Sequence, residues 1–445
     1  MHYHQQLRNP EDQGLGSRRA RQAQSGDEAS VCKVALLGFG TVGRSVARIL
    51  GTRPFSRLRL THICNRNIER KRVSWLPFEV HWTERIEDVL AADVDVLVEL
   101  IGGLKPAEEW VRRALLAGKS VVTANKQLIA HCGPELIELA RKQGCHIAFG
   151  ASVAGGIPVV SGLQEGLAGD RLFKVCGILN GTCNYILTKI EAGMSFAGAL
   201  REAQELGFAE ADPTEDVDGF DARAKLAILA RVGLRTPIRP PEIACRSISV
   251  IEQVDFTYAL HLGCTIRQVS RAEVRGKRLF ASVEPALVPL SSPLSSVQGS
   301  QNLVMATGEF GGETVFSGHG AGGDPTAVAV VSDLIAIALS KNHATMACPP
   351  VPEAAHKLTS DFVSPHYLRF TVKDRPGIIA AIAGIFANHA INIDSTFQKP
   401  GYPKARLPFV ITVEACRTST IEQAMEEIRA LDFHVQPAIR LPIIT

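Results

Sequence analysis

The stretch VALLGFGTVGRSVARIL, residues 34–50, runs an apolar strand pattern directly into a glycine-rich turn and then into a helix pattern. Its centre, GFGTVG at 38–43, has the G-x-G-x-x-G spacing of turns that approach the pyrophosphate of a dinucleotide. The free N–H groups at the start of the following helix favour phosphate binding. A glycine-rich turn without a ligand is the alternative, and the matching strand and helix on either side disfavour it.

Strand and helix patterns keep alternating as far as residue 150. Apolar strands are predicted at 58–65, 93–102 and 120–125, and helices at 107–119 and 135–144. This rhythm is typical of a parallel sheet with helices on both faces. We therefore predict an α/β fold, with a Rossmann-type dinucleotide-binding domain at residues 31–150.

The end of the second predicted strand bears on which dinucleotide binds. An NAD-specific site would place Asp or Glu there, to bind the ribose 2′-hydroxyl. This sequence instead has Arg66, followed by Arg70, Lys71 and Arg72. Because a guanidinium suits a phosphate group, we expect NADP as the cofactor, with NAD as the alternative. A solvated basic loop would show the same run of charges.

The pattern changes beyond the first domain. Strands alternate more strictly and helices lengthen over residues 151–323, which predicts an α+β substrate and dimerisation domain. The apolar segment at 324–345 predicts a helix that packs back on the first domain.

The remaining segments are a linker, a small domain and a leader. Four prolines at 348–365 predict a linker over residues 346–365. Patterns over residues 366–445 follow the order β-α-β-β-α-β, which is ferredoxin-like. The polar residues 1–30 predict a disordered leader.

Composition argues against several classes of protein. Of 445 residues, 48 are basic and 45 acidic, so nothing indicates a nucleic-acid partner. We expect no membrane span, because no apolar run of about eighteen residues stands out. The ten cysteines form no C-x-x-C pair and no zinc-ligand spacing, which indicates reduced thiols in a cytoplasmic protein.

Two segments carry candidate catalytic groups. Lys126 ends the TANK segment (123–126) at the carboxyl end of a predicted strand, where open α/β sheets bind ligands. From its position alone, an exposed lysine at a strand end would be the better interpretation. In the acidic segment 208–225, Asp221 and Lys225 are four residues apart and share one helix face. A surface ion pair and a solvated acidic turn are the alternatives there.

These groups suit hydride transfer between a nicotinamide and a carbonyl compound. Reduction of the carbonyl needs a proton donor at its oxygen, and a positioned lysine ammonium supplies one. Carboxylates nearby would hold a substrate ammonium group. Such a site needs no metal in its chemistry.

The chain resembles homoserine dehydrogenases over residues 31–345. The segments that carry the resemblance occur in the family's order: GFGTVG (38–43), ELIGG (99–103), TANK (123–126), ASVAGGIP (151–158), GILNGTCNYIL (177–187), ADPTEDVDGFDARAKL (211–226) and GHGAGGDPTA (318–327). The resemblance implies NAD(P)-dependent interconversion of L-aspartate 4-semialdehyde and L-homoserine, in threonine, methionine and isoleucine biosynthesis.

The resemblance also implies roles for individual residues. Lys225 matches the family's acid/base lysine and Lys126 a second lysine at the reacting centre. The implied substrate-binding residues are Glu210, Asp216, Asp221, Gly181 and Thr182. The implied cofactor-binding residues are Gly38, Phe39, Gly40, Thr41, Val42, Gly43, Arg66, Gly102, Thr123, Lys126, Gly320 and Gly322.

The family also binds a structural monovalent cation, usually sodium, through main-chain carbonyls. The matching positions are Gly150, Val153, Gly155 and Ile157. Gly150 stands where the family usually has Glu, so any support from that side chain is missing. Cys183 replaces the family's usual Thr, which we interpret as a swap of one small polar group for another.

Residues 366–445 resemble an ACT domain. The matching residues lie in DRPGII (374–379) and NID (392–394). The resemblance implies paired modules that bind an amino acid, most plausibly threonine as a feedback inhibitor. The implied effector residues are Asp374, Pro376, Gly377, Ile378, Asn392 and Ile393, and a homodimer or homotetramer is expected. A purely structural dimerisation module is the alternative.

Two other functions remain as alternatives. One is an NAD(P) oxidoreductase acting on a different amino acid or semialdehyde. The other is a catalytically inactive regulator that binds nucleotide and amino acid. The presence of Lys126, Lys225, Glu210 and Asp221 argues against the regulator.

Overall fold

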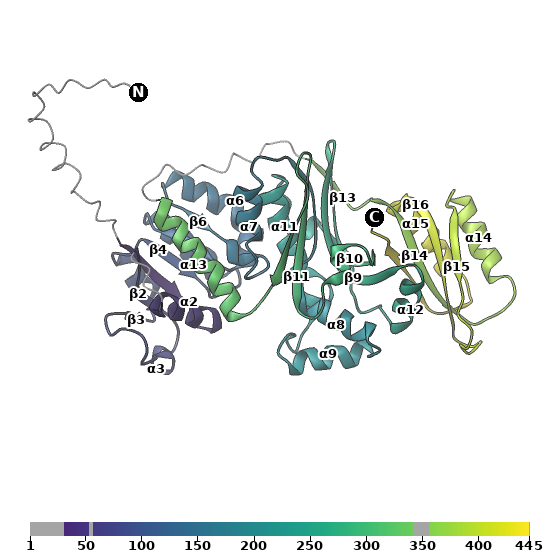
Figure 1. Cartoon of the computed structure of the whole chain (residues 1–445), viewed down its shortest axis with the longest axis horizontal. Helices are drawn as coiled ribbons and strands as arrows, with labels where there is room; N and C mark the ends of the chain where they lie inside the picture. Colours follow the sequence, from purple (N-terminus) through teal and green to yellow (C-terminus); the bar gives the residue numbers. More distant parts are fainter. Residues whose placement is uncertain (1–30, 53–56, 341–355, 445) are drawn as a thin grey trace, which may run out of the picture.

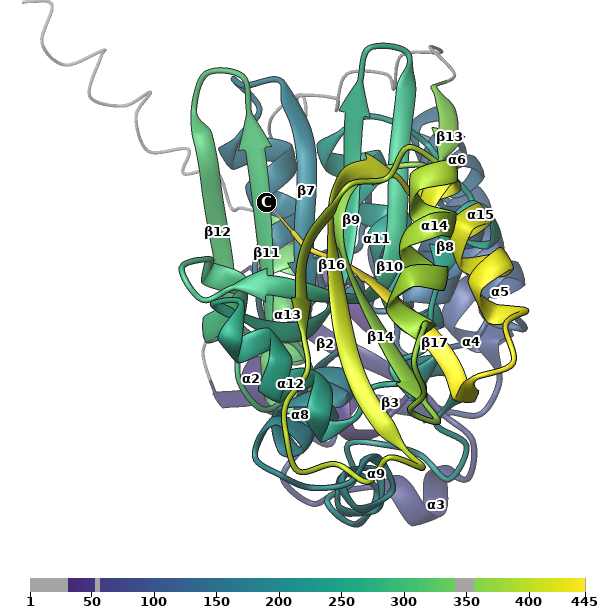
Figure 2. The ribbon, with the colours of Figure 1, turned by 90° about the vertical axis from the view of Figure 1, so that its right-hand side faces the viewer.

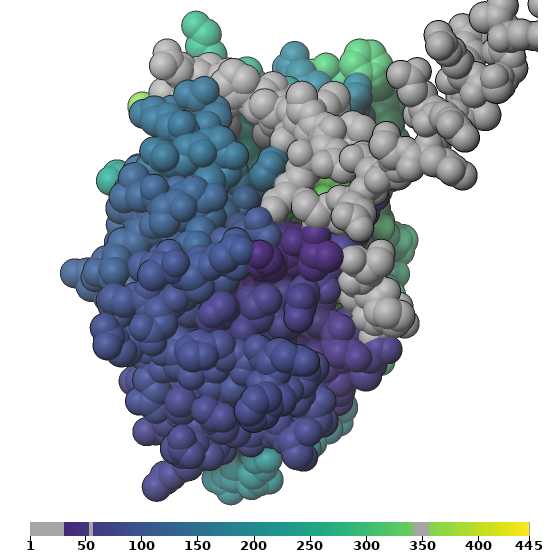
Figure 3. Space-filling view, turned by 90° about the vertical axis from the view of Figure 1, so that its left-hand side faces the viewer, coloured from purple at the N-terminus to yellow at the C-terminus, as the bar shows by residue number. Residues whose placement is uncertain are grey.

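The computed structural model describes residues 31–52, 57–340 and 356–444. In the described residues three sheets, each with its own helices, form an N-terminal, a middle and a C-terminal domain in a row (Figure 1). The purple and blue surface of the N-terminal domain makes up much of the face seen in Figure 3. The predicted leader, residues 1–30, lies outside the described residues.

The N-terminal domain is built on a parallel sheet in the order β3-β2-β1-β4-β5-β6. Its strands are β1 (Cys32–Leu37), β2 (Leu58–Cys64), β3 (His81–Thr83), β4 (Val96–Glu99), β5 (Ser120–Thr123) and β6 (Ile147–Ala148). The strand order reverses between β1 and β4, and ligands bind at such a switch point, outside the carboxyl ends of the strands. The predicted Rossmann-type domain is confirmed.

Helices cover both faces of this sheet. Alternate residues of β1 serve the two sides: Val34 and Leu36 pack with one group of helices, and Ala35 and Leu37 with the other. The first group contains α2 (Thr41–Thr52) and α13 (Gly323–Ser340). The second contains α4 (Ile86–Ala91), α5 (Ala107–Leu116) and α6 (Lys126–Lys142). A short helix, α3 (Ile68–Lys71), follows β2.

Helix α13 lies in the apolar segment for which the sequence predicted a helix packed back on the first domain. By length and composition alone it is apolar enough to cross a membrane. Its buried residues, among them Val330 and Leu334, join the core that contains Val34 and Val46. This packing accounts for the apolar composition of the helix without a bilayer.

The middle domain contains a mixed sheet in the order β12-β11-β7-β9-β10-β13, with β8 beside β10. Neighbours are antiparallel except β8 and β13, which run parallel to β10. The strands are β7 (Leu172–Ile178), β8 (Ala244–Cys245), β9 (Cys264–Arg275), β10 (Arg278–Pro289), β11 (Gln301–Gly308), β12 (Gly312–His319) and β13 (Lys357–Thr359).

Helix α11 (Phe220–Gly233) packs on one face of this sheet, where Val175, Ala272 and Val283 meet it. A second core joins α8 (Gly181–Glu191), α9 (Phe196–Glu205) and α12 (Gln253–His261). The domain also contains the short helices α7 (Val159–Ser161) and α10 (Thr214–Val217).

Strand β13 corrects the predicted linker over residues 346–365. Lys357 and Thr359 pair with Arg278 and Phe280 of β10, so this part of the segment belongs to the middle sheet. The segment from 357 to 359 contains no proline, and Leu358 packs against the main core of the middle domain. The first ten residues of the predicted linker, up to residue 355, lie outside the described residues.

The C-terminal domain has an antiparallel sheet in the order β15-β16-β14-β17, which confirms the predicted ferredoxin-like arrangement. Its elements are β14 (Val363–Val372), α14 (Ile378–Asn388), β15 (Ile393–Phe397), β16 (Leu407–Arg417), α15 (Thr418–Arg429) and β17 (His434–Pro442). The helices pack on one face of the sheet, over Phe370 and Ile411.

The other face of the C-terminal sheet lies against the middle domain, in front of β9 and β10 in Figure 2. Tyr367, Val410 and Leu441 share a core there with Ile266 and Leu287. The contact is continuous with the rest of the protein interior, so the C-terminal domain is not a loosely tethered module.

Candidate active site

The glycine turn leaves its middle open to a ligand. Gly38 has φ +106° and lies against the backbone of Leu100. A Cβ on Gly43 would overlap the main-chain oxygen of Gly38, so only glycine allows this close approach. A Cβ on Gly40, in contrast, would meet nothing within 4 Å. Because α2 begins at Thr41 and presents its free N–H groups here, the turn suits a dinucleotide pyrophosphate.

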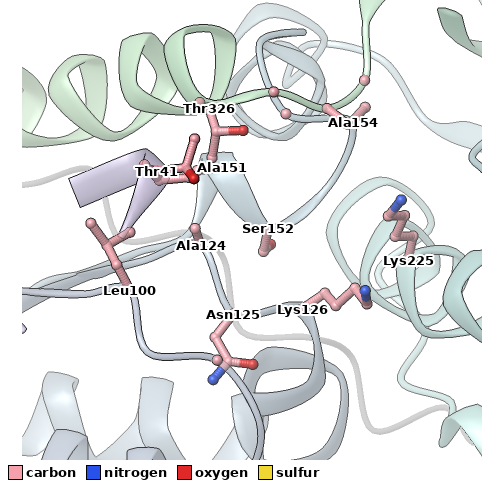
Figure 4. Close-up of a pocket in the computed structure, with 17 residues that line it drawn as sticks. Thr41, Leu100, Ala124, Asn125, Lys126, Ala151, Ser152, Ala154, Lys225 and Thr326 are labelled. Carbon is pink, nitrogen blue, oxygen red and sulfur yellow. The ribbon is translucent and has the colours of Figure 1, made fainter. Parts of the chain in front are cut away.

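A cavity of about 460 Å³ opens next to this turn, between the N-terminal and middle domains (Figure 4). Several predicted residues line it, namely Thr41, Val42, Gly102, Lys126, Gly155, Lys225, Gly320 and Gly322. In Figure 4 the two lysines lie together at one end of the cavity, while Thr41 and Leu100 lie at the other. Thr123 is fully buried and is not among the lining residues.

Glu99 is a buried carboxylate that the sequence did not single out. It is 0% exposed, and its Oε2 accepts a hydrogen bond from Thr123 Oγ1 at 2.6 Å. Its Oε1 accepts from the backbone N–H groups of Ile101 and Gly102 at 2.9 and 3.1 Å. Glu99 thus fixes the loop that lines the cavity. Thr123 supports this loop indirectly, by its hydrogen bond to Glu99. The acid that ends an apolar strand in ELIGG was the available signal.

The two candidate lysines meet on one carboxylate. Lys126, the first residue of α6, places its Nζ 2.7 Å from Asp221 Oδ1. Lys225 places its Nζ 2.8 Å from Asp221 Oδ2, and also donates to the main-chain oxygen of Leu179 at 2.8 Å. Asp221 is 4% exposed, which rules out the alternative of a surface ion pair.

The bridge favours the charged forms of Asp221 and Lys126. Burial would raise the pKa of Asp221, but Lys225 and Lys126 hold that pKa well below its usual range. Burial lowers the pKa of Lys126, but the charge of Asp221 outweighs it and leaves the pKa above the ordinary value. The site therefore presents the paired ammonium of Lys126 to the cavity.

Asn180 ties a second carboxylate to this bridge. Its Nδ2 donates to Asp221 Oδ2 at 2.8 Å and to Asp216 Oδ1 at 2.6 Å. Its Oδ1 accepts from the backbone N–H of Cys183 and caps α8. Burial raises the pKa of Asp216 despite the hydrogen bond from Asn180.

The other predicted substrate residues form no hydrogen bond or ion pair with the lysine bridge in the described part of the chain. A Cβ on Gly181 would lie 2.5 Å from the main-chain oxygen of Ser300, so this glycine allows close packing of two loops. Thr182 is buried and donates to the main-chain oxygen of Phe208 at 2.7 Å. Glu210 is exposed, and within the described residues its carboxylate has no hydrogen-bonded partner. The structure does not bring Glu210 to the lysine bridge.

Cys183 lies beside the bridge as a neutral thiol. Its Sγ donates to the main-chain oxygen of Asp216 at 3.0 Å, as a threonine hydroxyl would. Burial raises the pKa of this thiol well above its ordinary value.

Arg66 lies just beyond the carboxyl end of β2, close to the glycine turn, and is exposed. Its neighbour Asn65 accepts a hydrogen bond from the backbone N–H of Phe39 at 2.9 Å. The ring of Phe39 is buried against Trp82, so Phe39 offers a ligand its backbone only.

The predicted cation segment packs against α13. The backbone N–H of Gly150 donates to Asp333 Oδ2 at 2.9 Å, and a Cβ on Gly150 would lie 2.9 Å from Asp333 Oδ1. Burial raises the pKa of Asp333 to about 7. A Cβ on Gly155 would lie 2.8 Å from the main-chain oxygen of Gly320, so this segment also supports the cavity wall.

The carboxylate of Asp333 therefore occupies the space that a side chain at position 150 would need. Its only signal in the sequence was an acid within an apolar helix. In the described part of the chain no cluster of three or more His, Cys, Asp or Glu could hold a metal ion. Any cation at this segment would depend on main-chain carbonyls.

The predicted effector corner encloses a cavity of about 290 Å³. Gly377 has φ +93° and begins α14. The lining residues include Asp374, Pro376, Gly377 and Ile378 as predicted, together with Gln398 and Phe409, which the sequence did not single out. Asn392 and Ile393 are not among the lining residues, and Asn392 instead donates to Glu414 Oε2 at 3.1 Å.

Comparisons with protein families cover most of the chain. A family model described as homoserine dehydrogenase matches residues 158–335, and one described as its NAD-binding domain matches residues 38–150. An ACT domain model matches residues 366–433.

Individual relatives agree with the family matches. A homoserine dehydrogenase of Bacillus subtilis is 40% identical over 379 residues, which are 83% of this chain and 88% of the relative. One of Synechocystis is 37% identical over 418 residues, which are 90% of this chain and 96% of the relative.

Solved structures have the same fold. A homoserine dehydrogenase structure from Thiobacillus denitrificans superposes with a TM-score of 0.87 at 33% identity, covering 93% of this chain and 98% of that one. A hyperthermophilic archaeal homoserine dehydrogenase in complex with NADPH gives a TM-score of 0.60 at 29% identity, covering 69% of this chain and 98% of that one.

Proposed function

The chain belongs to the homoserine dehydrogenase family, and from this premise we propose that it interconverts L-aspartate 4-semialdehyde and L-homoserine with NADP, in threonine, methionine and isoleucine biosynthesis. It is an NAD(P)-dependent oxidoreductase. The observation that carries the finer proposal is the Lys126–Asp221–Lys225 bridge at one end of the cavity beside the glycine turn.

The proposed mechanism assigns the proton to Lys225. When bound, the dinucleotide supplies the hydride. In the reduction direction the Lys225 ammonium gives a proton from Nζ to the carbonyl oxygen of the semialdehyde, and the neutral amine takes it back during oxidation. Asp221 keeps that ammonium oriented, through the hydrogen bond at 2.8 Å.

Lys126 has a different proposed task. Its pKa is raised by Asp221, so it stays a cation throughout the cycle. A fixed cation next to the substrate oxygen stabilises the negative charge that develops there. The glycine turn and the loop fixed by Glu99 are proposed to hold the dinucleotide through their backbones.

Substrate recognition is proposed to come from the surrounding acids. Asp216 and Glu210 would bind the ammonium group of the amino-acid substrate, since charge-assisted hydrogen bonds of this kind are strong. Gly181 and Thr182 would contribute through the backbone at the start of α8. Glu210 is exposed and lies away from the lysine bridge, so its proposed role requires that it approach the bound substrate.

NADP rather than NAD is the proposed cofactor. The exposed guanidinium of Arg66 follows β2, where the ribose of a dinucleotide bound to this fold is expected. The related archaeal structure is described as a complex with NADPH, which supports this choice.

Sodium, threonine and self-association complete the proposal. Sodium would bind the main-chain carbonyls of Gly150, Val153, Gly155 and Ile157. Threonine would bind in the cavity at Gly377 and inhibit the enzyme as its end product. We also propose a homodimer or homotetramer in the cytoplasm.

A single kinetic experiment tests the core of this proposal. Purified protein is given L-homoserine with NADP or NAD, with and without threonine, and formation of the reduced cofactor is followed by absorbance. We expect turnover with a preference for NADP. Intact cofactor binding without turnover from either dinucleotide would instead support a catalytically inactive regulator.

A further inference from the structure

Helix α6, which begins with Lys126, contains a proline in its interior. Pro134 has no backbone N–H, so the main-chain oxygen of Ala130, four residues earlier, lacks its usual helical donor. Ala130 is 2% exposed, so water does not readily replace that donor. A buried carbonyl of this kind needs a hydrogen-bond partner from elsewhere.

A side chain of the middle domain supplies the missing donor. Arg231, in the last turn of α11, donates from Nη2 to the main-chain oxygen of Ala130 at 3.4 Å. It donates from Nη1 to the main-chain oxygen of Ile129 at 2.8 Å. Arg231 is only 7% exposed, so its guanidinium is buried between the two helices.

Gly133 makes this arrangement sterically feasible. A Cβ at that position would overlap Nη1 of Arg231. Three residues therefore fit one another: Pro134 removes a donor, Gly133 clears the space and Arg231 fills the gap. These three residues belong neither to the glycine turn nor to the lysine bridge.

The same two helices carry the candidate catalytic groups. Lys126 begins α6, and Asp221 and Lys225 lie on α11. The ion pair of Lys126 with Asp221 joins the helices at one point, and the guanidinium of Arg231 joins them at a second. Two points of attachment fix both the distance and the angle between the helices, which one point does not.

We propose that Arg231 is a positioning residue for the reaction: by bonding the carbonyl that Pro134 leaves without a donor, it holds Lys126 in register with Asp221 and Lys225. The kinetic part of this inference rests on the proposed function, because it assumes that the lysines act on the substrate. The structural part, that Arg231 compensates for Pro134, does not.

The test is a double-mutant cycle. Arg231→Met removes the donors but keeps an extended apolar side chain, and we expect kcat to fall by about ten- to a hundredfold while the KM for NADP is unchanged. Pro134→Ala restores the backbone N–H, so the helix can bond Ala130 by itself. The double variant Arg231→Met/Pro134→Ala should recover much of the lost stability, measured as the urea midpoint, but not the lost kcat, because the donor restored at Ala130 does not join α6 to α11. Additive losses in the urea midpoint, or full recovery of kcat, would overturn the proposal.

A pH profile separates positioning from loss of folded protein. In Arg231→Met we expect the basic limb of the kcat profile to move to lower pH, because Lys126 loses close contact with the carboxylate that raises its pKa. A smaller fraction of folded enzyme would lower the profile without moving this limb. An unmoved limb would count against the proposal.

Further variants guard against a folding defect. Gly133→Ala displaces the guanidinium without removing it, and should move the basic limb in the same direction. Arg231→Lys keeps a donor and should retain more activity than Arg231→Met. Arg141→Met is the matched control, since Arg141 is an exposed guanidinium of the same helix that pairs with Glu138. It should leave both kcat and the pH profile unchanged.

Failure of this inference is distinguishable from failure of the proposed function. If the wild-type protein turns over L-homoserine with neither dinucleotide, the proposed function is wrong, yet Arg231→Met and Pro134→Ala should still be coupled in their urea midpoints. If the wild-type protein is active and that coupling is absent, only the role of Arg231 is wrong.

Discussion

Arg369 Nε lies 2.8 Å from Asp255 Oδ1, and the two side chains are 2% and 0% exposed. The pair joins β14 of the C-terminal domain to α12 of the middle domain. Tyr367 also donates to Asp255 Oδ1, at 2.8 Å. The domain that resembles an effector module is thus attached to the catalytic domain through a buried, hydrogen-bonded charge pair.

Breaking this pair should destabilise the protein. Asp255→Ala leaves the buried Arg369 guanidinium with only the half-exposed carboxylate of Glu252 as a charge partner, and we expect a cost of about 3–5 kcal/mol in the free energy of unfolding. Urea unfolding followed by circular dichroism measures it. The double variant Asp255→Ala/Arg369→Met should lose less than the single variant. Equal or larger losses in the double variant would show that the pair is not coupled.

Lys225→Ala should abolish most of the turnover. Loss of the proposed acid/base lowers kcat by about 10²- to 10⁴-fold. NADPH affinity, measured by fluorescence titration, should be nearly unchanged, because the glycine turn is intact. Lys277→Ala, at the exposed turn between β9 and β10, is the control and should behave as wild type. Wild-type rates in Lys225→Ala would remove the assigned role.

Arg66→Ala should change the cofactor preference. A charge-assisted hydrogen bond contributes about 1.5–3 kcal/mol, so the KM for NADP should rise by roughly tenfold or more while the KM for NAD stays the same. Arg59, exposed near the other end of β2, provides the matched control as Arg59→Ala. A parallel rise in both KM values would argue against recognition of the 2′-phosphate.

The effector corner is best tested by a point variant. Gly377→Val places a branched side chain at φ +93°, where L-residues are strained, although a Cβ there meets nothing within 4 Å. We expect the threonine concentration for half-inhibition to rise by about tenfold, or roughly 1.4 kcal/mol. Gly401→Val imposes similar strain, at φ +99°, outside the residues that line this cavity, and should keep the wild-type response. Deletion of the domain is a poorer test, because it would uncover Ile266 and Leu287.

Acid should weaken the protein through His366. This side chain is 0% exposed, and burial together with Arg440 lowers its pKa to about 3, with Arg271 and Arg246 contributing. Below pH ~6.5 the His366 imidazole binds a proton in the unfolded chain but stays neutral in the folded chain. The free energy of unfolding therefore falls as the pH decreases toward 3. At pH 5 the loss amounts to about 2 kcal/mol. His366→Gln should flatten this dependence in urea titrations, whereas His261→Gln, at an exposed position, should not.

Local pattern in the sequence was enough for the fold of each domain. The glycine turn at 38–43 and the TANK segment lie at carboxyl ends of parallel strands, as their flanking patterns predicted. The pair of Asp221 and Lys225 was visible as an i,i+4 spacing on one helix. The spacing could not show that Asp221 is buried. Its burial distinguishes the observed bridge with Lys126 and Lys225 from a surface ion pair.

Contacts between distant segments carried no local signal. Gly150 and Asp333 are 183 residues apart, and Arg231 and Ile129 are 102 apart. Nothing in the sequence singled out Arg231, and the helix predicted at 135–144 began only after Pro134, whereas α6 begins at Lys126. The position of Asn392 outside the effector cavity was likewise decided by packing, since its side chain pairs with Glu414 across the sheet.

Helix α13 has a consequence for how the chain is made. The face of the first sheet that carries Val34, Leu36 and Val98 is covered in part by Ala327, Val330 and Leu334. A ribosome that has completed the strands of that sheet must still synthesise the middle domain from β7 to β12 before it delivers this helix. The nascent nucleotide domain therefore emerges with an uncovered apolar face, and the middle domain has the opportunity to fold first.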